Sequence, residues 1–493
     1  CIPMEFQKEQ FLSDVAEQLR VWEVPSASVC VVRGDEVLLA DGVGLRDGKS
    51  QLADGETLYQ IASCSKAFTA TAAAILATEG RLDLDAPVAE YLPAFRMQEP
   101  YASSHLTARD FLSHRSGLPR HEYAWYGTGF TRQELMENLR YLPLSAPIRY
   151  TFQYSNFNYL IAGCLIEAVS GLPFEEFLRQ RIFLPLGMEH TVAFSEDMLR
   201  SSNYALPFDR EEPYAAHGIR EIPFYRSPAE RPGVGDPTAA AGCVISCAGD
   251  MAKWLRFQLD RGRVNGQSLV REDLMDLLYT PHIHMGDDPA HAPERTMMSY
   301  GLGWMACSYR GRRMVEHGGN INGFSTYAAV LPEEQLGIFA SANMNVTLLA
   351  EAIVRDAADR LLGHADGNWY ERLRRRNAQQ FQELKSFYAS FGGETVPGTS
   401  PSHPLADYAG DYAAPGYRRF RITCENGALK ADFNTFVVGL RHLHYDSFAT
   451  QGVIGELPAG LVLTFGTDAK GRVRTLSAVL GNEAGLAPIV FTK

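Results

Sequence analysis

The chain has 493 residues, of which 46% are hydrophobic and 21% are charged. This balance excludes a disordered or low-complexity protein, and the length predicts more than one domain. The chain has 58 acidic and 46 basic residues, which gives a formal net charge of −12. This negative charge argues against nucleic acid as a partner.

The first half of the chain predicts helices around one early β-hairpin. Apolar residues at helical spacing indicate a helix over 5–21. Two apolar runs, 26–33 and 36–44, flank Gly34-Asp35 and predict the hairpin. Alanine-rich residues 63–79 predict a further helix. Later helices are expected over 107–113, 156–170 and 250–259, with a long proline-rich loop over 193–237.

Strand patterns follow this helical region. The runs 313–316, 325–331 and 336–342 predict three strands, and residues 348–362 predict a helix. Because strands occur at both ends of this part of the chain with helices between them, we expect an α+β domain. Its antiparallel sheet would be closed by the two ends of that segment.

The C-terminal part has a different pattern. Residues 368–391 carry one apolar helical face, and residues 392–404 are rich in Gly, Pro, Ser and Thr, as linkers are. From Leu405 onward, short strands alternate with turns such as Asn426-Gly427, which predicts a small antiparallel barrel or sandwich. The predicted organisation is a first domain over 1–365, a helix and linker over 366–403, and a barrel over 404–493.

Ser63-x-x-Lys66, at the predicted start of the 63–79 helix, is the strongest chemical signal. Residues at i and i+3 share one helical face, and the N–H groups at a helix N-terminus favour a developing oxyanion. Burial would lower the pKa of the lysine and favour a neutral amine that can accept the serine proton. A helix-capping serine followed by a surface lysine is the alternative interpretation of this pair.

A second motif, Tyr154-x-Asn156, lies just before the 156–170 helix. A phenol near a cationic lysine can shift towards a phenolate and act as a general base. The Asn156 amide can orient Lys66 and a substrate carbonyl. Taken alone, the motif also fits an ordinary loop tyrosine followed by a capping asparagine.

A third motif, His317-Gly318-Gly319-Asn320, follows the run 313–316. Two glycines let a ligand lie close to the strand backbone, and an N–H group there can complete an oxyanion hole. A strand-end turn carrying a surface histidine is the alternative interpretation.

The three motifs, in this order, resemble those of serine β-lactamases and penicillin-binding proteins. The resemblance is closest to class C β-lactamases and their esterase and D-aminopeptidase relatives. It implies a catalytic domain with an antiparallel sheet flanked by helices and an all-helical lobe. The stretch from Tyr408 to Tyr412 is similar to the lipocalin-like barrels appended to some peptidases of this family. Further similar segments are 112–119, 185–188, 240–254 and 300–304.

The resemblance also implies site roles. Ser63 would be the nucleophile of an acyl-enzyme mechanism, and Lys66 and Tyr154 would share the general-base and proton-shuttle work. The N–H groups of Ser63 and Asn320 would form the oxyanion hole. Together with Asn320, the residues expected to bind substrate or shape this hole are Asn156, His317, Gly318 and Gly319.

The third motif departs from the family pattern. His317-Gly318-Gly319 stands where β-lactamases and transpeptidases have Lys-Thr-Gly or a close variant, whose cation helps to hold a substrate carboxylate. This departure argues against an efficient β-lactamase and fits the branch with esterase or D-amino-acid peptidase activity.

The predicted function is therefore a serine hydrolase acting on a small peptide or amide, including one with a D-residue. A carboxylesterase or acyltransferase of the same family is the first alternative. A non-catalytic penicillin-recognising sensor or scaffold is an alternative of another class. No metal or organic cofactor is implied, and a homo-oligomer fits the family.

The compartment is predicted from two features. No apolar run approaches ~18 residues, and no basic start precedes an apolar stretch, so we expect neither a transmembrane segment nor a signal peptide. Several of the eight cysteines, such as Cys30 and Cys164, lie in apolar surroundings, which favours free thiols. These features favour a cytoplasmic protein and leave a periplasmic or secreted one open.

Overall fold

An eight-stranded antiparallel sheet forms the centre of the first domain. The computed structural model describes residues 6–212, 215, 217–231, 234–391, 393–451, 460–481 and 487–493. The sheet order is β2-β1-β14-β13-β12-β11-β10-β9, so strands from the start of the chain pair with strands near residue 340. The strands are β1 (Ser26–Arg33), β2 (Glu36–Gly44), β9 (Ile283–His284), β10 (Arg295–Tyr300), β11 (Met305–Tyr309), β12 (Arg312–Ile321), β13 (Phe324–Leu331) and β14 (Leu336–Ala342).

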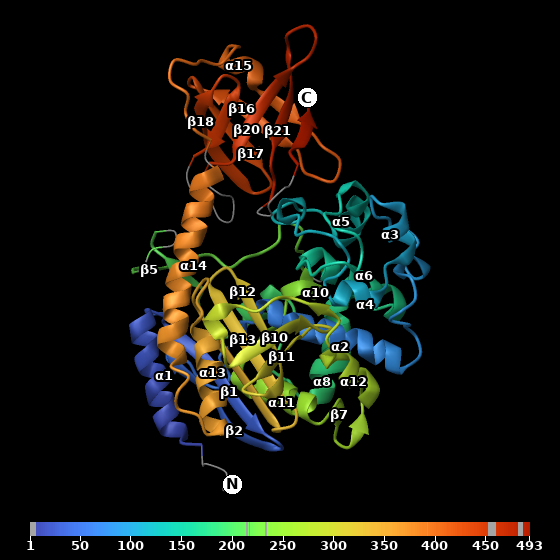
Figure 1. Cartoon of the computed structure of the whole chain (residues 1–493), viewed down its shortest axis with the longest axis vertical. Helices are drawn as coiled ribbons and strands as arrows, with labels where there is room; N and C mark the ends of the chain where they lie inside the picture. Colours follow the sequence, from blue (N-terminus) through green and yellow to red (C-terminus); the bar gives the residue numbers. More distant parts are fainter. Residues whose placement is uncertain are drawn as a thin grey trace.

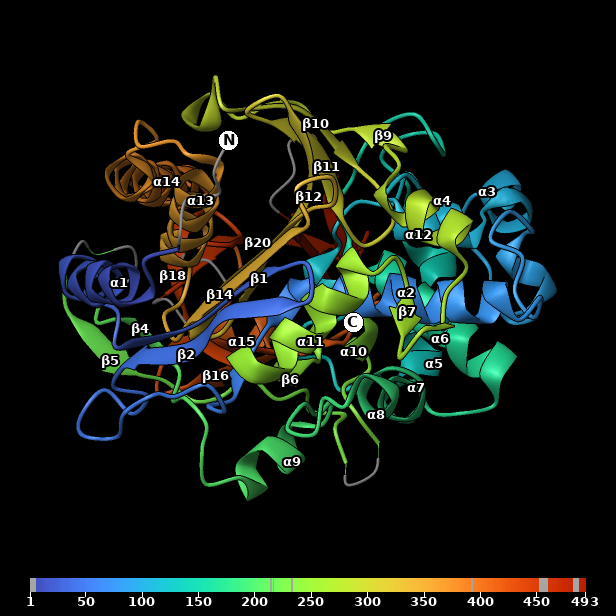
Figure 2. The ribbon, with the colours of Figure 1, turned by 90° about the horizontal axis from the view of Figure 1, so that it is seen from below.

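The predicted hairpin and the sheet closed by the ends of this segment are both confirmed. Every residue of β13 and β14 is buried, because helices cover both faces of the sheet. Figure 2 shows α1 (Lys8–Trp22) and α13 (Leu349–Leu362) on one face, and α11 (Ala248–Leu259) with the helical lobe on the other. The helix predicted over 5–21 is α1, and residue 5 lies outside the described residues.

The helical lobe is built around α2 (Ser65–Thr78), which is buried on nearly all sides. Its alanine content therefore indicates close helix packing as well as helix propensity. Among the described residues no single helix is long and apolar enough to cross a membrane. The segments Asn156–Ser170 and Phe174–Leu186, which are bent by 73° relative to each other, pass that test only together. The other helices of the lobe are α3 (Pro100–His105), α4 (Ala108–Leu112), α5 (Arg132–Asn138), α6 (Asn156–Ser170), α7 (Phe174–Leu178), α8 (Leu184–Leu186), α10 (Ala239–Gly242) and α12 (Glu272–Tyr279).

The region 193–237, predicted as a long loop, contains some regular structure. It includes a short helix and a two-stranded antiparallel ribbon. Such short elements carry too few residues for a periodic pattern to show in the sequence. They are α9 (Ser195–Arg200), β4 (Phe208–Arg210) and β5 (Ile219–Glu221), and two further ribbons pair β3 (Tyr59–Gln60) with β6 (Ile245–Ser246) and β7 (Arg263–Val264) with β8 (Gln267–Ser268).

A buried cluster of charges lies between the sheet and α13. Arg355 of α13 is 2.6 Å from Glu316 of β12, and both side chains are fully buried. Arg295 contacts the other oxygen of Glu316 at 3.0 Å, and Glu351 lies 3.0 Å from Arg355. Because successive strand residues point to opposite faces, Glu316 faces this cluster while the following residue, His317, faces the helical lobe.

The C-terminal part is a nearly closed antiparallel barrel, carried at the end of the long helix α14 (Trp369–Phe391) (Figure 1). A bridge between Ala413 and Thr492 joins its first and last strands. The predicted barrel is confirmed, and burial alternates along β17 as expected for a sheet with one inward face. After α15 (Leu405–Tyr408), its strands are β15 (Gly410–Tyr412), β16 (Phe420–Glu425), β17 (Ala428–Phe433), β18 (Phe436–His444), β19 (Ser447–Thr450), β20 (Val462–Thr467), β21 (Val473–Ala478) and β22 (Ile489–Thr492).

Candidate active site

Ser63 lies in a single 3-10 turn, Ala62–Cys64, that leads directly into α2. The α-helix thus begins two residues later than the sequence pattern predicts. Ala62, just before the serine, has a φ of 49°, which is the left-handed region that costs energy for a residue with a side chain. This strained turn places the partly exposed Ser63 at the floor of a cavity.

Lys66, one turn further along, is fully buried and has three polar contacts. Its Nζ lies 3.0 Å from the Ser63 Oγ and 3.0 Å from the Asn156 Oδ1. The third contact, at 2.8 Å, is with the carbonyl oxygen of Ala241 in α10. Three segments far apart in the sequence therefore meet at this one amine, and two of the predicted motifs are brought together.

Burial shifts the pKa values of two side chains at this site, Lys66 and Tyr154. The loss of water, with a further contribution from the charge of Arg120, holds the pKa of Lys66 well below its usual value. Burial also raises the pKa of Tyr154, and the contact with Ser63 offsets only part of this rise. Burial thus disfavours the phenolate form of Tyr154 that the motif was expected to favour, and it also disfavours the ammonium form of Lys66.

Tyr154 nevertheless lies against the lysine. The Lys66 Nζ is 4.8 Å from the centre of the Tyr154 ring, on one of its faces. The buried His114 packs 4.3 Å from the same ring, measured between ring centres. Tyr154 thus packs against both Lys66 and His114, beside the Ser63–Lys66 pair.

The third motif lies within β12, which continues through residues 317–320 and pairs with β13. The strand therefore extends beyond the predicted end at 316. A Cβ at Gly319 would lie 2.5 Å from the Ile61 oxygen and 2.9 Å from the Ser63 nitrogen, so only glycine permits this approach. A Cβ at Gly318 would lie 3.3 Å from the Tyr327 ring, so a side chain there would have little room.

His317 is buried and uses both of its ring nitrogens. Its Nδ1 lies 2.6 Å from the Gly318 carbonyl oxygen, and its Nε2 lies 2.8 Å from the Tyr300 hydroxyl. A carbonyl oxygen only accepts, so Nδ1 carries the proton and Nε2 accepts from the tyrosine. Burial lowers the pKa of His317 to about 3, so the ring is neutral.

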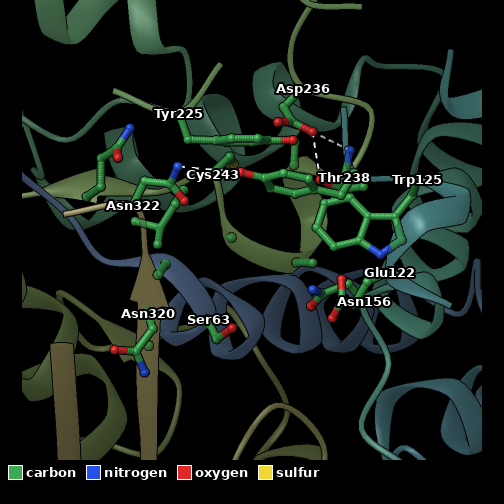
Figure 3. Close-up of a pocket in the computed structure, with 18 of the residues that line it drawn as sticks. Ser63, Glu122, Trp125, Asn156, Tyr225, Asp236, Thr238, Cys243, Asn320 and Asn322 are labelled. Atoms are coloured by element: carbon green, nitrogen blue, oxygen red, sulfur yellow. Dashed lines mark hydrogen bonds between the residues drawn. The ribbon is translucent and has the colours of Figure 1, made fainter. Parts of the chain in front are cut away.

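These residues line a cavity of about 450 Å³. Figure 3 shows Ser63 between Asn320 on one side and Asn156 on the other, with Tyr225 and Trp125 across the cavity. The Asn320 Oδ1 accepts a hydrogen bond from Ser325, which directs its side chain to the sheet. The predicted site residues other than Lys66 thus line this cavity.

The rest of the lining includes residues that sequence reasoning missed. Arg120 there pairs with Glu122 at 2.6 Å and also lies 5.3 Å from the centre of the Tyr154 ring. Burial raises the pKa values of Glu230 and Asp236. Most of these residues come from irregular segments between helices, where no periodicity marks them; the set is Arg120, Glu122, Trp125, Tyr126, Tyr225, Glu230 and Asp236.

Across the described ranges, no set of three or more His, Cys, Asp or Glu side chains is arranged to hold a metal ion. The seven cysteines with described positions are free thiols.

Comparison with known proteins assigns the family. The Beta-lactamase family profile matches residues 15–361, and a domain of unknown function, DUF3471, matches residues 394–493. The unguisins hydrolase ungD′ of Aspergillus campestris is 29% identical over 432 residues, which cover 84% of this chain and 77% of that protein.

Two solved structures share the fold. The octameric penicillin-binding protein homologue from Pyrococcus abyssi aligns with a TM-score of 0.62 at 21% identity, covering 99% of this chain and 100% of that one. A D-stereospecific amidohydrolase from Streptomyces sp. aligns with a TM-score of 0.52 at 22% identity, covering 68% of this chain and 94% of that one. The predicted fold class and the family resemblance are both confirmed.

Proposed function

Because this chain belongs to the beta-lactamase family, we propose that it is a serine hydrolase that works through an acyl-enzyme on Ser63. The observation that carries the proposal is the 3.0 Å contact between the Ser63 Oγ and the buried Lys66 Nζ. Burial lowers the pKa of Lys66, which favours the neutral amine, and a neutral amine can take the serine proton.

The contacts of Lys66 fit this role. A neutral amine has two N–H donors and one lone pair. The Ala241 carbonyl oxygen and the Asn156 Oδ1 accept hydrogen bonds, so they engage the two N–H groups. The lone pair is then left for the Ser63 hydroxyl. Asn156 is therefore proposed to orient the base.

The reaction follows from these positions. The Ser63 oxygen attacks the substrate carbonyl carbon as its proton passes to Lys66. The proton then goes, by way of the neutral Tyr154 hydroxyl, to the leaving amine, and the C–N bond breaks to give the acyl-enzyme. Water, deprotonated by the same groups, attacks the acyl carbon and releases the acid and free Ser63.

The oxyanion of each tetrahedral intermediate is proposed to bind the N–H groups of Ser63 and Asn320. The close approach of Gly319 to the Ser63 nitrogen supports this, because it brings the β12 backbone beside the nucleophile. Gly318 and His317 hold that end of β12 in place through the ring contacts described above.

A small peptide or amide, including one with a D-residue, is the proposed substrate. Support comes from two similar proteins, one named as a hydrolase of unguisins and one as a D-stereospecific amidohydrolase. Esters and acyl transfer are the alternatives within the family, and a penicillin-recognising scaffold is the alternative outside enzymes.

The test combines labelling with a substrate panel. An activated serine probe such as a fluorophosphonate should add its mass to Ser63, and Ser63→Ala should remove the label. A panel of D- and L-aminoacyl amides, nitrophenyl esters and a chromogenic cephalosporin should then show amide turnover. A chain that is never labelled at Ser63 would favour the scaffold, and turnover of esters alone would favour the esterase.

Two further properties are proposed. Hydrolysis should persist in EDTA, because the nucleophile, the base and the oxyanion donors named above are groups of the chain. The chain is also proposed to self-associate, with support from the octameric structure that shares its fold. Sedimentation velocity at several protein concentrations would measure its oligomeric state.

A further inference from the structure

The tip of one barrel hairpin contacts the loop that forms a wall of the active-site cavity. The hairpin joins β17 to β18, and Asn434 in its turn has a φ of 55°. The Asn434 Nδ2 donates hydrogen bonds of 3.1 Å to the Tyr123 carbonyl oxygen and 2.9 Å to the Tyr126 carbonyl oxygen. Asparagine tolerates this left-handed backbone conformation better than most residues. Asn434 can therefore form the turn and also donate the two hydrogen bonds to the loop.

Tyr126 contacts the barrel and also lines the active-site cavity. Its ring lines the cavity and is 8% exposed. On one side it stacks against Phe436 of β18, with ring centres 6.1 Å apart, and on the other against Tyr225, at 5.1 Å. Its hydroxyl accepts a 3.4 Å hydrogen bond from Asn322. Three nearly parallel rings, one of them from the barrel, thus build this wall.

The backbone beside Tyr126 packs closely on the same hairpin. A Cβ at Gly127, which has a φ of 68°, would lie 2.7 Å from the Thr435 Oγ1. Arg418 of the barrel donates a hydrogen bond to the carbonyl oxygen of Thr128. The barrel therefore holds this loop at several consecutive residues.

We infer that the β17–β18 hairpin is a specificity element of the active site, which fixes Tyr126 and thereby the cavity wall that faces Ser63. The inference rests on the proposed serine-hydrolase function. Asn434 contacts the loop backbone and acts through Tyr126, so it is a positioning residue. Its loss should weaken ground-state and transition-state binding alike, which raises KM and leaves kcat unchanged.

The effect should depend on substrate size. A peptide amide that extends beyond the scissile bond reaches the aromatic wall, whereas nitrophenyl acetate presents only a methyl group and a small leaving group. The Asn434→Gly variant keeps the left-handed turn and removes both hydrogen bonds. Two ordinary hydrogen bonds correspond to at least a ~5-fold change in binding, so we expect KM for the peptide amide to rise ~5-fold or more.

Asn426→Gly is the matched control. Asn426 has a φ of 52° in the exposed turn at the other end of β17, so the same substitution is made in the other turn that flanks this strand, outside the cavity lining. Asn426→Gly should leave kcat and KM unchanged for both the peptide amide and nitrophenyl acetate. For Asn434→Gly, kcat for the amide and both constants for nitrophenyl acetate should stay within about twofold of wild type.

A second pair of variants tests the same contact with substitutions in the catalytic domain. Gly127→Ala adds the Cβ that meets Thr435, whereas Gly171→Ala introduces similar strain, at a φ of 78°, where a Cβ meets no described atom within 4 Å. Only Gly127→Ala should raise KM for the peptide amide. Adding Thr435→Ala should restore much of the lost affinity, which a general loss of stability would not allow.

Equal behaviour of Asn434→Gly and Asn426→Gly towards both substrates would overturn the inference. So would a Gly127→Ala defect that Thr435→Ala leaves unchanged. Failure of the wild-type protein to label at Ser63 with a fluorophosphonate would refute the proposed function, and the inference with it. The two failures are therefore told apart by the wild-type labelling result.

Discussion

Asn156→Asp is the substitution that tests the proposed base most directly. It changes one amide nitrogen to oxygen and places a carboxylate 3.0 Å from the Lys66 Nζ. A neighbouring negative charge favours the ammonium form, so the pKa of Lys66 should rise. Because catalysis needs the neutral amine, activity is lost as pH falls through this pKa, and the acid limb of the pH profile should move to higher pH.

The magnitude follows from the distance. At 3.0 Å and an effective dielectric constant of ~20, two unit charges attract by about 5 kcal/mol, and one pKa unit corresponds to ~1.4 kcal/mol. Partial burial of the new carboxylate opposes part of this attraction. We therefore expect the acid limb of kcat/KM to shift upward by at least ~1 unit and at most ~4, with a ~10-fold loss of rate per unit at pH values below the new limb.

The assay is kcat/KM for a neutral nitrophenyl ester measured across pH, because this ratio reports ionisations of the free enzyme. Asn322→Asp is the control, since Asn322 lines the cavity and bonds to Tyr126 rather than to Lys66. An acid limb that stays in place in Asn156→Asp, or that moves equally in Asn322→Asp, would refute the assignment of Lys66 as the base.

Three further outcomes are expected. Tyr154→Phe should lower kcat by ~10²–10⁴, the usual effect of removing a positioned acid–base group; near-normal turnover would remove Tyr154 from the mechanism. Arg355→Met leaves Glu316 buried without its 2.6 Å partner, so urea titration should show a loss of ~3–5 kcal/mol in the free energy of unfolding; a loss below ~1 kcal/mol would contradict this reasoning. Because neutral His317 offers no cation, kcat/KM should be lower for a cephalosporin than for a neutral ester and a D-aminoacyl amide; equal or faster cephalosporin turnover would contradict that role.

The parts of the site that the sequence predicts are those with local geometry. Ser63 and Lys66 share a helical face because they are three residues apart, and the structure places their polar atoms 3.0 Å apart. Asn156 could be expected beside them only through the order of the three motifs, since 90 residues separate it from Lys66. The strand and helix patterns of the first domain likewise follow from periodicity within each element.

The parts that the sequence does not predict depend on burial and on distant contacts. The neutral state of Tyr154 reflects its surroundings in the folded chain, which a motif does not contain. Trp125 and Tyr225 come from segments without periodic pattern, so nothing in the sequence places them at the cavity. The contact of Asn434 with Tyr126 joins residues 308 positions apart, and its turn looks like any other hairpin turn of the barrel.

The packing of α2 and the chemistry of Lys66 have one physical origin. A lysine can reach the carbonyl oxygen of Ala241 at 2.8 Å only if α10 lies close to α2 and α6, and small residues permit that approach. A Cβ at Gly163 of α6 would lie 2.8 Å from the Ala240 Cβ, and one at Gly303 would lie 2.6 Å from the Lys66 carbonyl oxygen. A larger residue at Gly163 would separate α6 from α10, and one at Gly303 would push the turn between β10 and β11 away from α2. Either change would admit water. Water around the amine would return its pKa towards the usual value, so substitutions that loosen this packing should weaken the base before they unfold the domain.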